Sequence, residues 1–179
     1  MFLPPKSLLL IIDVQGNLAY RMHDKDNLFK HLQGLIQAAQ ILAIPIIATE
    51  QVPEKIGSTV PEIANYLKGV SPIIKQSFSC YLSEDFKRAL KSLRRKQIIV
   101  AGIETHVCVY QTVADLLENK YNVQVVADAV SSRTLENKLL ALNRIKFLGA
   151  DLTSTEMIIC ELLKTSAHPK FKDVLKLIK

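Results

Sequence analysis

Residues 98 to 111, which read IIVAGIETHVCVYQ, constrain the fold more than any other part of the chain. The first six residues form an unbroken apolar run, which is typical of a strand buried on both faces of a parallel sheet. After a short polar turn, four residues follow the spacing of one helical face: Val109, Val113, Leu116 and Leu117. The pattern predicts a central strand followed by a helix, with Cys108 in the first turn of that helix.

Similar apolar runs and helical stripes alternate along the rest of the sequence. Further strands are predicted at 8–12, 44–48, 72–74, 123–127 and 152–155, with a polar loop at 49–61. Helical patterns fill most of the intervals, including 28–42, 135–148 and the closing stripe of Phe171, Val174, Leu175 and Ile178. This alternation predicts a parallel sheet with helices on both faces. No repeat or linker divides the chain, so we expect one domain over residues 1–179.

Composition and cysteine content indicate the kind of compartment in which the protein works. The 179 residues are 49% hydrophobic, and the three cysteines form no disulfide pattern, which favours a reducing compartment. The N-terminal apolar run is too short for a signal peptide, and no stretch approaches the roughly 20 apolar residues of a membrane span. We therefore expect a cytoplasmic protein without membrane contact.

The net charge of +6 raises the question of a nucleic-acid partner. A basic cluster lies between residues 87 and 96, but Phe86, Leu90 and Leu93 interleave with it at helical spacing. The charges are therefore interpreted as the wet face of an amphipathic helix, and no nucleic-acid partner is expected.

Three predicted strands lead directly into residues able to do chemistry: Asp13, Lys75 and Cys108. Each alone has an ordinary structural explanation, as a helix cap, a surface charge or a packed thiol. Together they offer a proton acceptor, a cation and a nucleophile at the sheet edge where α/β proteins bind ligands. Both the helix start and the lysine would favour the Cys108 thiolate.

These residues and their surroundings resemble the isochorismatase-like cysteine hydrolase superfamily. Thr49-Glu50-Gln51 and Thr59-Val60-Pro61-Glu62 resemble its metal-free isochorismatase domain-containing branch in particular. The likeness rests on Asp13-Val14-Gln15, on Lys75, and on the segment from Gly102 to Val109, and it extends from about Leu8 to Met157. It implies a three-layer sandwich with a six-stranded parallel sheet, for which we expect the Rossmann-like order 3-2-1-4-5-6. It also implies an Asp13–Lys75–Cys108 triad, a non-proline cis peptide near Glu104–Thr105, and a homo-oligomer.

Departures from the family patterns refine the predicted reaction. Metal-binding nicotinamidases of the superfamily carry an Asp-x-His motif where this chain reads Ala48-Thr49-Glu50-Gln51. No metal site and no cofactor are therefore expected. Isochorismatases that cleave a vinyl ether lack the nucleophilic cysteine, so Cys108 argues against that reaction.

The resulting hypothesis is a metal-independent amidohydrolase that cleaves a small amide or related C–N bond through a thioester on Cys108. Backbone N–H groups of Cys108 and of the Glu104–Thr105 turn would form the oxyanion hole. Six residues on loops at the same edge could line a small-molecule substrate pocket: Gln15, Asn17, Tyr20, Phe78, Tyr81 and His106.

Two alternatives stay open on the same fold. A thiol redox sensor would use a low-pKa cysteine but would not need Asp13, and a catalytically idle binding or scaffold protein would need no substrate. A phospho-receiver domain is set aside because Lys75 occupies the place of its aspartate. Dinucleotide and nucleotide enzymes are set aside because the glycines form neither GxGxxG nor a P-loop.

Overall fold

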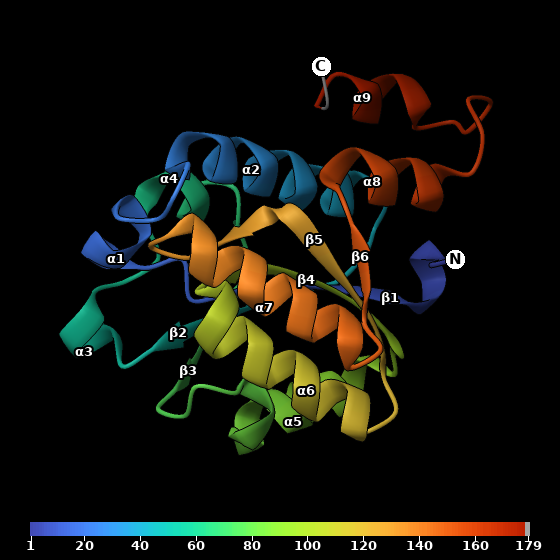
Figure 1. The fold of residues 1–179 in the computed structure, drawn as a ribbon. Coiled ribbons are helices and arrows are strands. Elements are labelled where there is room, and N and C mark those ends of the chain that lie inside the picture. The colour runs from blue at the N-terminus through green and yellow to red at the C-terminus, as the bar shows by residue number, and fades with distance from the viewer. Residues whose placement is uncertain (178–179) are drawn as a thin grey trace.

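Six parallel strands form one sheet in the order β3-β2-β1-β4-β5-β6, as the resemblance predicted. The computed structural model describes residues 1–177. The strands are β1 (Ser7–Ile12), β2 (Ile46–Gln51), β3 (Ile73–Lys75), β4 (Gln97–Ile103), β5 (Asn122–Ser131) and β6 (Asp151–Thr153). The fold is therefore a three-layer α/β sandwich with β1 and β4 at the centre of the sheet (Figure 1).

The two central strands are buried on both faces because apolar side chains point from them into both cores. Leu9 and Ile11 of β1 pack into the core on one side, and Leu8, Leu10 and Ile12 pack into the core on the other. β4 divides its side chains in the same way. The unbroken apolar runs of the sequence thus correspond to strands covered by helices on both sides.

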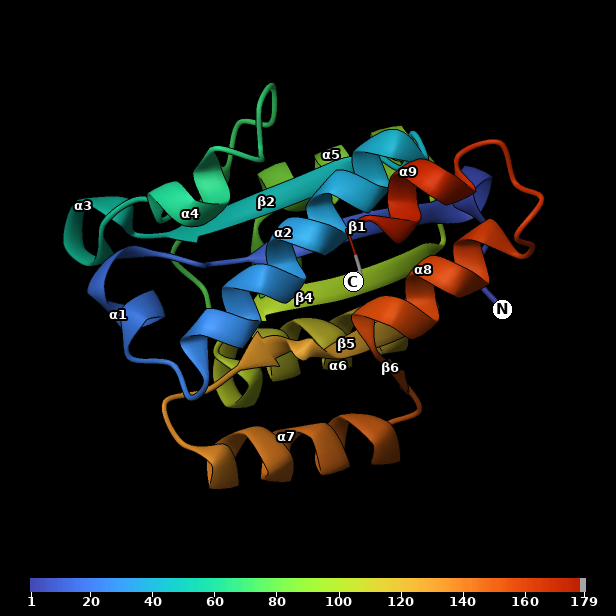
Figure 2. The same ribbon diagram turned by 90° about the horizontal axis from the view of Figure 1, so that it is seen from above.

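Helices cover both faces of the sheet (Figures 1 and 2). One layer holds α2 (Lys25–Ile41), α4 (Pro61–Ala64) and α8 (Thr155–Leu163), with α9 (Phe171–Leu175) packed outside α2 and α8. The other layer holds α5 (Glu84–Leu93), α6 (Tyr110–Glu118) and α7 (Leu135–Phe147). Short elements join them: α1 (Gly16–Tyr20), α3 (Pro53–Ile56), 3₁₀ turns at Pro4–Lys6 and Cys80–Leu82, and a π-helical turn at Thr105–Val109.

Gly102 allows the two central strands to approach each other. It pairs with Ile12, its φ is +117°, and a Cβ on it would lie 2.1 Å from the Ile12 carbonyl oxygen. Only glycine fits a position that combines this φ with so close a backbone. The residue therefore fixes how β4 leaves the sheet immediately before the turn that leads to Cys108.

Several predicted boundaries were wrong. The second strand begins after Pro45 and runs on to Gln51, through residues expected in a loop, and α3 occupies part of that loop. β5 continues past Asp128 to Ser131 through a register shift against β4. Cys108 lies in the π-helical turn before α6, and Ile178 falls outside the described residues.

Candidate active site

Asp13 lies immediately beyond the end of β1 in the left-handed region, with φ of 50°. Its side chain is nearly inaccessible, and each carboxylate oxygen has a donor. Thr49 Oγ1 donates to Oδ1 at 2.7 Å, and Lys75 Nζ donates to Oδ2 at 2.6 Å. The carboxylate is therefore held in one orientation at the carboxyl edge of the sheet.

Lys75, the last residue of β3, reaches Asp13 across the intervening strand β2. Its side chain is 0% exposed, and its ammonium also donates to Gln51 Oε1 at 3.3 Å and to the carbonyls of Ser77 and Phe78 at 3.0 and 3.2 Å. These acceptors replace the water that burial removes. The structure thus brings together two residues that are 62 positions apart in the sequence.

Cys108 is buried beside this ion pair, and its thiol donates to Gln51 Oε1 at 3.2 Å. Burial raises the pKa of the Cys108 thiol, the negative charge of Asp13 raises it further, and the Lys75 ammonium only partly opposes them. The pKa of Cys108 therefore shifts in the opposite direction to the one expected from the helix start and Lys75, because burial and the Asp13 charge outweigh the lysine. The raised pKa favours the protonated thiol, and the Asp13 carboxylate lies beside it as a candidate proton acceptor.

A cavity of about 120 Å³ opens onto Cys108 and Asp13. Its remaining walls come from loops and strand ends at the carboxyl edge of the sheet: Gln15, Leu18, Gln51, Ile56, Phe78, Ile103, Glu104 and Val107. In Figure 2 this edge lies near α1 and α3. The candidate nucleophile and the candidate base therefore line the same cavity.

Two of the six predicted pocket residues line this cavity, namely Gln15 and Phe78. The other four lie outside its lining because they have different partners. Asn17 faces solvent, and the Tyr20 hydroxyl donates to Glu62. The ring of Tyr81 packs on Tyr121, and His106 Nδ1 lies 2.9 Å from Ser132 Oγ.

The turn between β4 and Cys108 contains a non-proline cis peptide, as the resemblance implied. It joins Ile103 to Glu104, one bond earlier than expected. The Glu104 side chain lines the cavity and accepts from the backbone N–H and Nε of Arg133 at 3.2 and 3.0 Å. The N–H groups of Val107 and Val109 both donate to the Glu104 carbonyl, which folds the turn tightly around the cysteine.

Sequence reasoning missed Thr49 and Gln51. Both lie in the part of β2 that was predicted to be a loop, because polar residues normally end a buried strand. Their polarity is explained by the site: Thr49 donates to Asp13, and Gln51 accepts from Lys75 and Cys108. Their place at the carboxyl end of a strand next to β1 was the only signal available.

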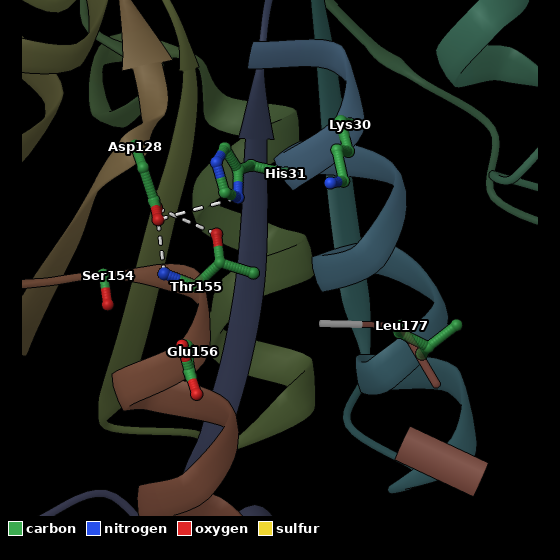
Figure 3. A pocket seen from close by; sticks show the side chains of 7 residues that line it. All are labelled: Lys30, His31, Asp128, Ser154, Thr155, Glu156 and Leu177. Carbon is green, nitrogen blue, oxygen red and sulfur yellow. Dashed lines mark hydrogen bonds and ion pairs between the residues drawn. The ribbon is translucent and has the colours of Figure 1, made fainter. Parts of the chain in front are cut away.

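A different hollow lies between α2 and the start of α8, and Figure 3 shows its lining. Asp128 accepts from the backbone N–H and the hydroxyl of Thr155 at 2.9 and 2.8 Å, and its other oxygen lies 3.6 Å from His31 Nδ1. These contacts fix the first turn of α8 to β5. The hollow contains none of the three predicted catalytic residues.

Two kinds of feature are absent from residues 1–177. Within that range no three His, Cys, Asp or Glu side chains are grouped so that they could hold a metal ion. In the same part of the chain, no helix combines the length and apolar character that crossing a membrane requires.

The family model for the isochorismatase domain matches residues 7–157, which include Asp13, Lys75 and Cys108. The chain belongs to the isochorismatase family. Among curated isochorismatase relatives, isochorismatase domain-containing protein 2 of Danio rerio is 39% identical over 96% of this chain and 86% of its own length. The secreted isochorismatase effector Isc1 of Phytophthora sojae is 38% identical over 99% of this chain and 86% of its own length.

Solved structures show the same isochorismatase fold. The MAR1 ribonuclease of Caenorhabditis elegans superposes with a TM-score of 0.93 at 40% identity, covering 99% of this chain and 91% of that one. YcaC of Pseudomonas aeruginosa, described with hexane-2,5-diol and covalent acrylamide, superposes with a TM-score of 0.92 at 26% identity. The match covers 98% of this chain and 90% of that one. Membership of this hydrolase family supports a hydrolytic function.

Proposed function

We propose that the chain is a metal-independent cysteine hydrolase that cleaves a small amide or related C–N bond. The observation that carries the proposal is that Asp13 and Cys108 line one cavity, with the buried Lys75 Nζ 2.6 Å from Asp13. A carboxylate, a cation and a thiol in this arrangement suit covalent catalysis. A related YcaC described with covalent acrylamide is consistent with a reactive group in this fold.

The first chemical step uses the protonated thiol. Asp13 accepts the Cys108 proton as Sγ attacks the carbonyl carbon, so that an S–C bond forms and the C=O π pair moves to oxygen. Lys75 balances the charge of Asp13 before the transfer and faces the developing thiolate during it. Backbone N–H groups of Cys108 and the Glu104–Thr105 turn then hold the oxyanion.

The second step releases the amine. The tetrahedral intermediate collapses, the C–N bond breaks, and protonated Asp13 gives its proton to the leaving nitrogen. Water, deprotonated by the same carboxylate, then attacks the thioester and returns Cys108 to the thiol. A cavity of about 120 Å³ favours small acyl groups, since drug-sized ligands occupy pockets of about 300 Å³ or more.

Ammonia release from a panel of small amides, N-carbamoyl compounds and nicotinamide tests this proposal. Turnover by the wild-type protein, lost in Cys108→Ala and in Asp13→Asn, is the expected result. Turnover that survives Cys108→Ala would overturn it. RNA belongs in the same panel, because one relative is described as a ribonuclease.

The two alternatives make different predictions. A redox sensor needs a thiolate that reacts quickly with oxidants, whereas burial and Asp13 raise the pKa of Cys108. A binding or scaffold protein would bind small amides at the cavity without releasing ammonia. Binding without turnover would therefore favour the scaffold.

We also propose that the chain forms a homo-oligomer through α7. Phe147 at the end of this helix is 92% exposed, and a hollow of about 340 Å³ lies beside it, lined also by Tyr110, Asn143, Arg144 and Leu148. A protruding aromatic ring next to a hollow is the arrangement that a two-fold contact between identical surfaces uses. A second copy of the chain would bury both.

A further inference from the structure

Gln51, the last residue of β2, is fixed through its backbone. Its N–H donates to Gln15 Oε1 at 2.7 Å, and its carbonyl accepts from Gln15 Nε2 at 3.2 Å. Gln15 Nε2 also donates to the Gly57 carbonyl at 2.6 Å. The side chain of Gln51 therefore starts from a defined position at the cavity wall.

The contacts of the carboxamide determine which way it faces. Lys75 Nζ donates to Oε1 at 3.3 Å, and the Cys108 thiol donates to the same oxygen at 3.2 Å. An ammonium has only donors, so the amide oxygen must face it and the NH₂ group must point elsewhere. The orientation of Gln51 is thus set by Lys75.

The NH₂ group of Gln51 has no acceptor among residues 1–177. Among the buried side-chain nitrogen and oxygen atoms of that range, only Thr105 Oγ1 and Gln124 Oε1 have no hydrogen-bond partner. Gln51 Nε2 is not one of them, so this unpaired atom is accessible to solvent. Gln51 lines the cavity together with Cys108, and no described residue occupies its two N–H bonds. Unpaired donors next to a nucleophile suit an acceptor on the substrate.

We propose that Gln51 is a catalytic residue that donates from Nε2 to the carbonyl oxygen of the substrate. This inference rests on the proposed amide hydrolysis. As Sγ attacks, the π pair of the carbonyl moves onto that oxygen, and the Gln51 N–H stabilises the growing negative charge. When the C–N bond breaks, the pair returns to the carbonyl and the hydrogen bond weakens.

The surrounding backbone explains why a side-chain donor is useful here. The N–H groups of Val107 and Val109, on either side of the nucleophile, both donate to the Glu104 carbonyl. They are therefore committed to the turn. Gln51, which comes from β2, supplies a side-chain donor instead, and it selects substrates with an acceptor oxygen on the attacked carbon.

Two variants test the assignment. Gln51→Met removes the donors at similar length, and Gln51→Glu keeps an oxygen for Lys75 while removing the N–H bonds. We expect kcat to fall about 10²-fold or more in both, with KM changed less than about threefold, because the bond strengthens only in the transition state. Gln37→Met, on α2 away from the cavity, is the matched control and should keep wild-type rates.

The pH dependence separates this role from tuning of the thiol. The rate of Cys108 alkylation by iodoacetamide against pH gives the thiol pKa of each variant, and the pH profile of kcat is measured beside it. A loss of kcat that persists across the profile supports the donor role. A loss recovered entirely by shifting the pH, or a kcat within about threefold of wild type in both variants, overturns it. Absence of any amide turnover by the wild-type protein would instead refute the proposed function, and this inference with it.

Discussion

Asp13 and Lys75 form an ion pair that has almost no access to water, with side chains 6% and 0% exposed. Asp13→Asn leaves the ammonium buried without its charge partner, so we expect a loss of about 3 kcal/mol in the free energy of unfolding. Asp26→Asn breaks an exposed pair with Lys25 and should change stability little. Urea denaturation of both variants makes the comparison, and equal effects would contradict the account.

Gly102 provides a second test at the scale of one residue. Gly102→Ala adds a Cβ that meets the Ile12 backbone at a strained φ, whereas Gly149→Ala has a φ of +103° and nothing within 4 Å of the added atom. The free energy of unfolding should fall by about 1 kcal/mol in the Gly149 variant, from backbone strain alone, and by several times more in the Gly102 variant. Similar midpoints in thermal or urea unfolding would show that β1 and β4 tolerate the added carbon.

At this scale the sequence could indicate the three reactive residues and not their partners. Asp13, Lys75 and Cys108 stand out because each follows a predicted strand, Cys108 after a short polar turn. Thr49 and Gln51 do not, because polar residues at a strand end resemble the start of a loop. The expected strand order already places β2 between β1 and β3, but only the structure shows that β2 runs on to Gln51 and that Lys75 donates to its side chain.

At the scale of elements, α7 differs most from its prediction. The helical pattern predicted at 135–148 has Leu139 and Phe147 among its apolar members, but these two side chains are 50% and 92% exposed. If this face is covered by a second copy, Phe147→Asp should shift the protein toward monomer, as measured by light scattering after size exclusion. Met157→Asp changes another exposed apolar residue, which lies on α8 and is 61% exposed, and should leave the oligomer intact. A monomeric wild-type protein would refute the interface.

Strand boundaries show where local patterns lose their predictive power. β1 and β4 were predicted nearly to the residue, because burial on both faces demands uninterrupted apolar side chains. β5 extends beyond its apolar run because a register shift between Val100 and Gly102 lets pairing with β4 resume at Val130. Such an irregularity depends on the neighbouring strand and leaves no local signal.

For the molecule as a whole, two buried thiols couple folding to pH. Burial raises the pKa of Cys80 from 9.0 to about 11, and burial together with Asp13 raises that of Cys108. Above pH 9 the unfolded chain releases these protons while the folded protein keeps them. Stability is therefore lost as the pH rises from 9, by up to about 1.4 kcal/mol per pH unit for each thiol.

Urea denaturation at several pH values between 7 and 10.5 measures this loss. Comparison with Cys80→Ala isolates one thiol from the lysines that titrate in the same range. The stability difference between wild type and the variant should shrink as the pH rises above 9. A difference independent of pH would mean that the Cys80 thiol titrates normally in the folded protein.

The central claim is that Cys108 becomes acylated during turnover. The most direct measurement is peptide mass spectrometry of protein quenched with acid during reaction with a small amide that the screen identifies. The account predicts an added acyl mass on the peptide containing Cys108, absent from Cys108→Ala. An adduct on Cys80 or Cys160, or one that persists in Cys108→Ala, would contradict it.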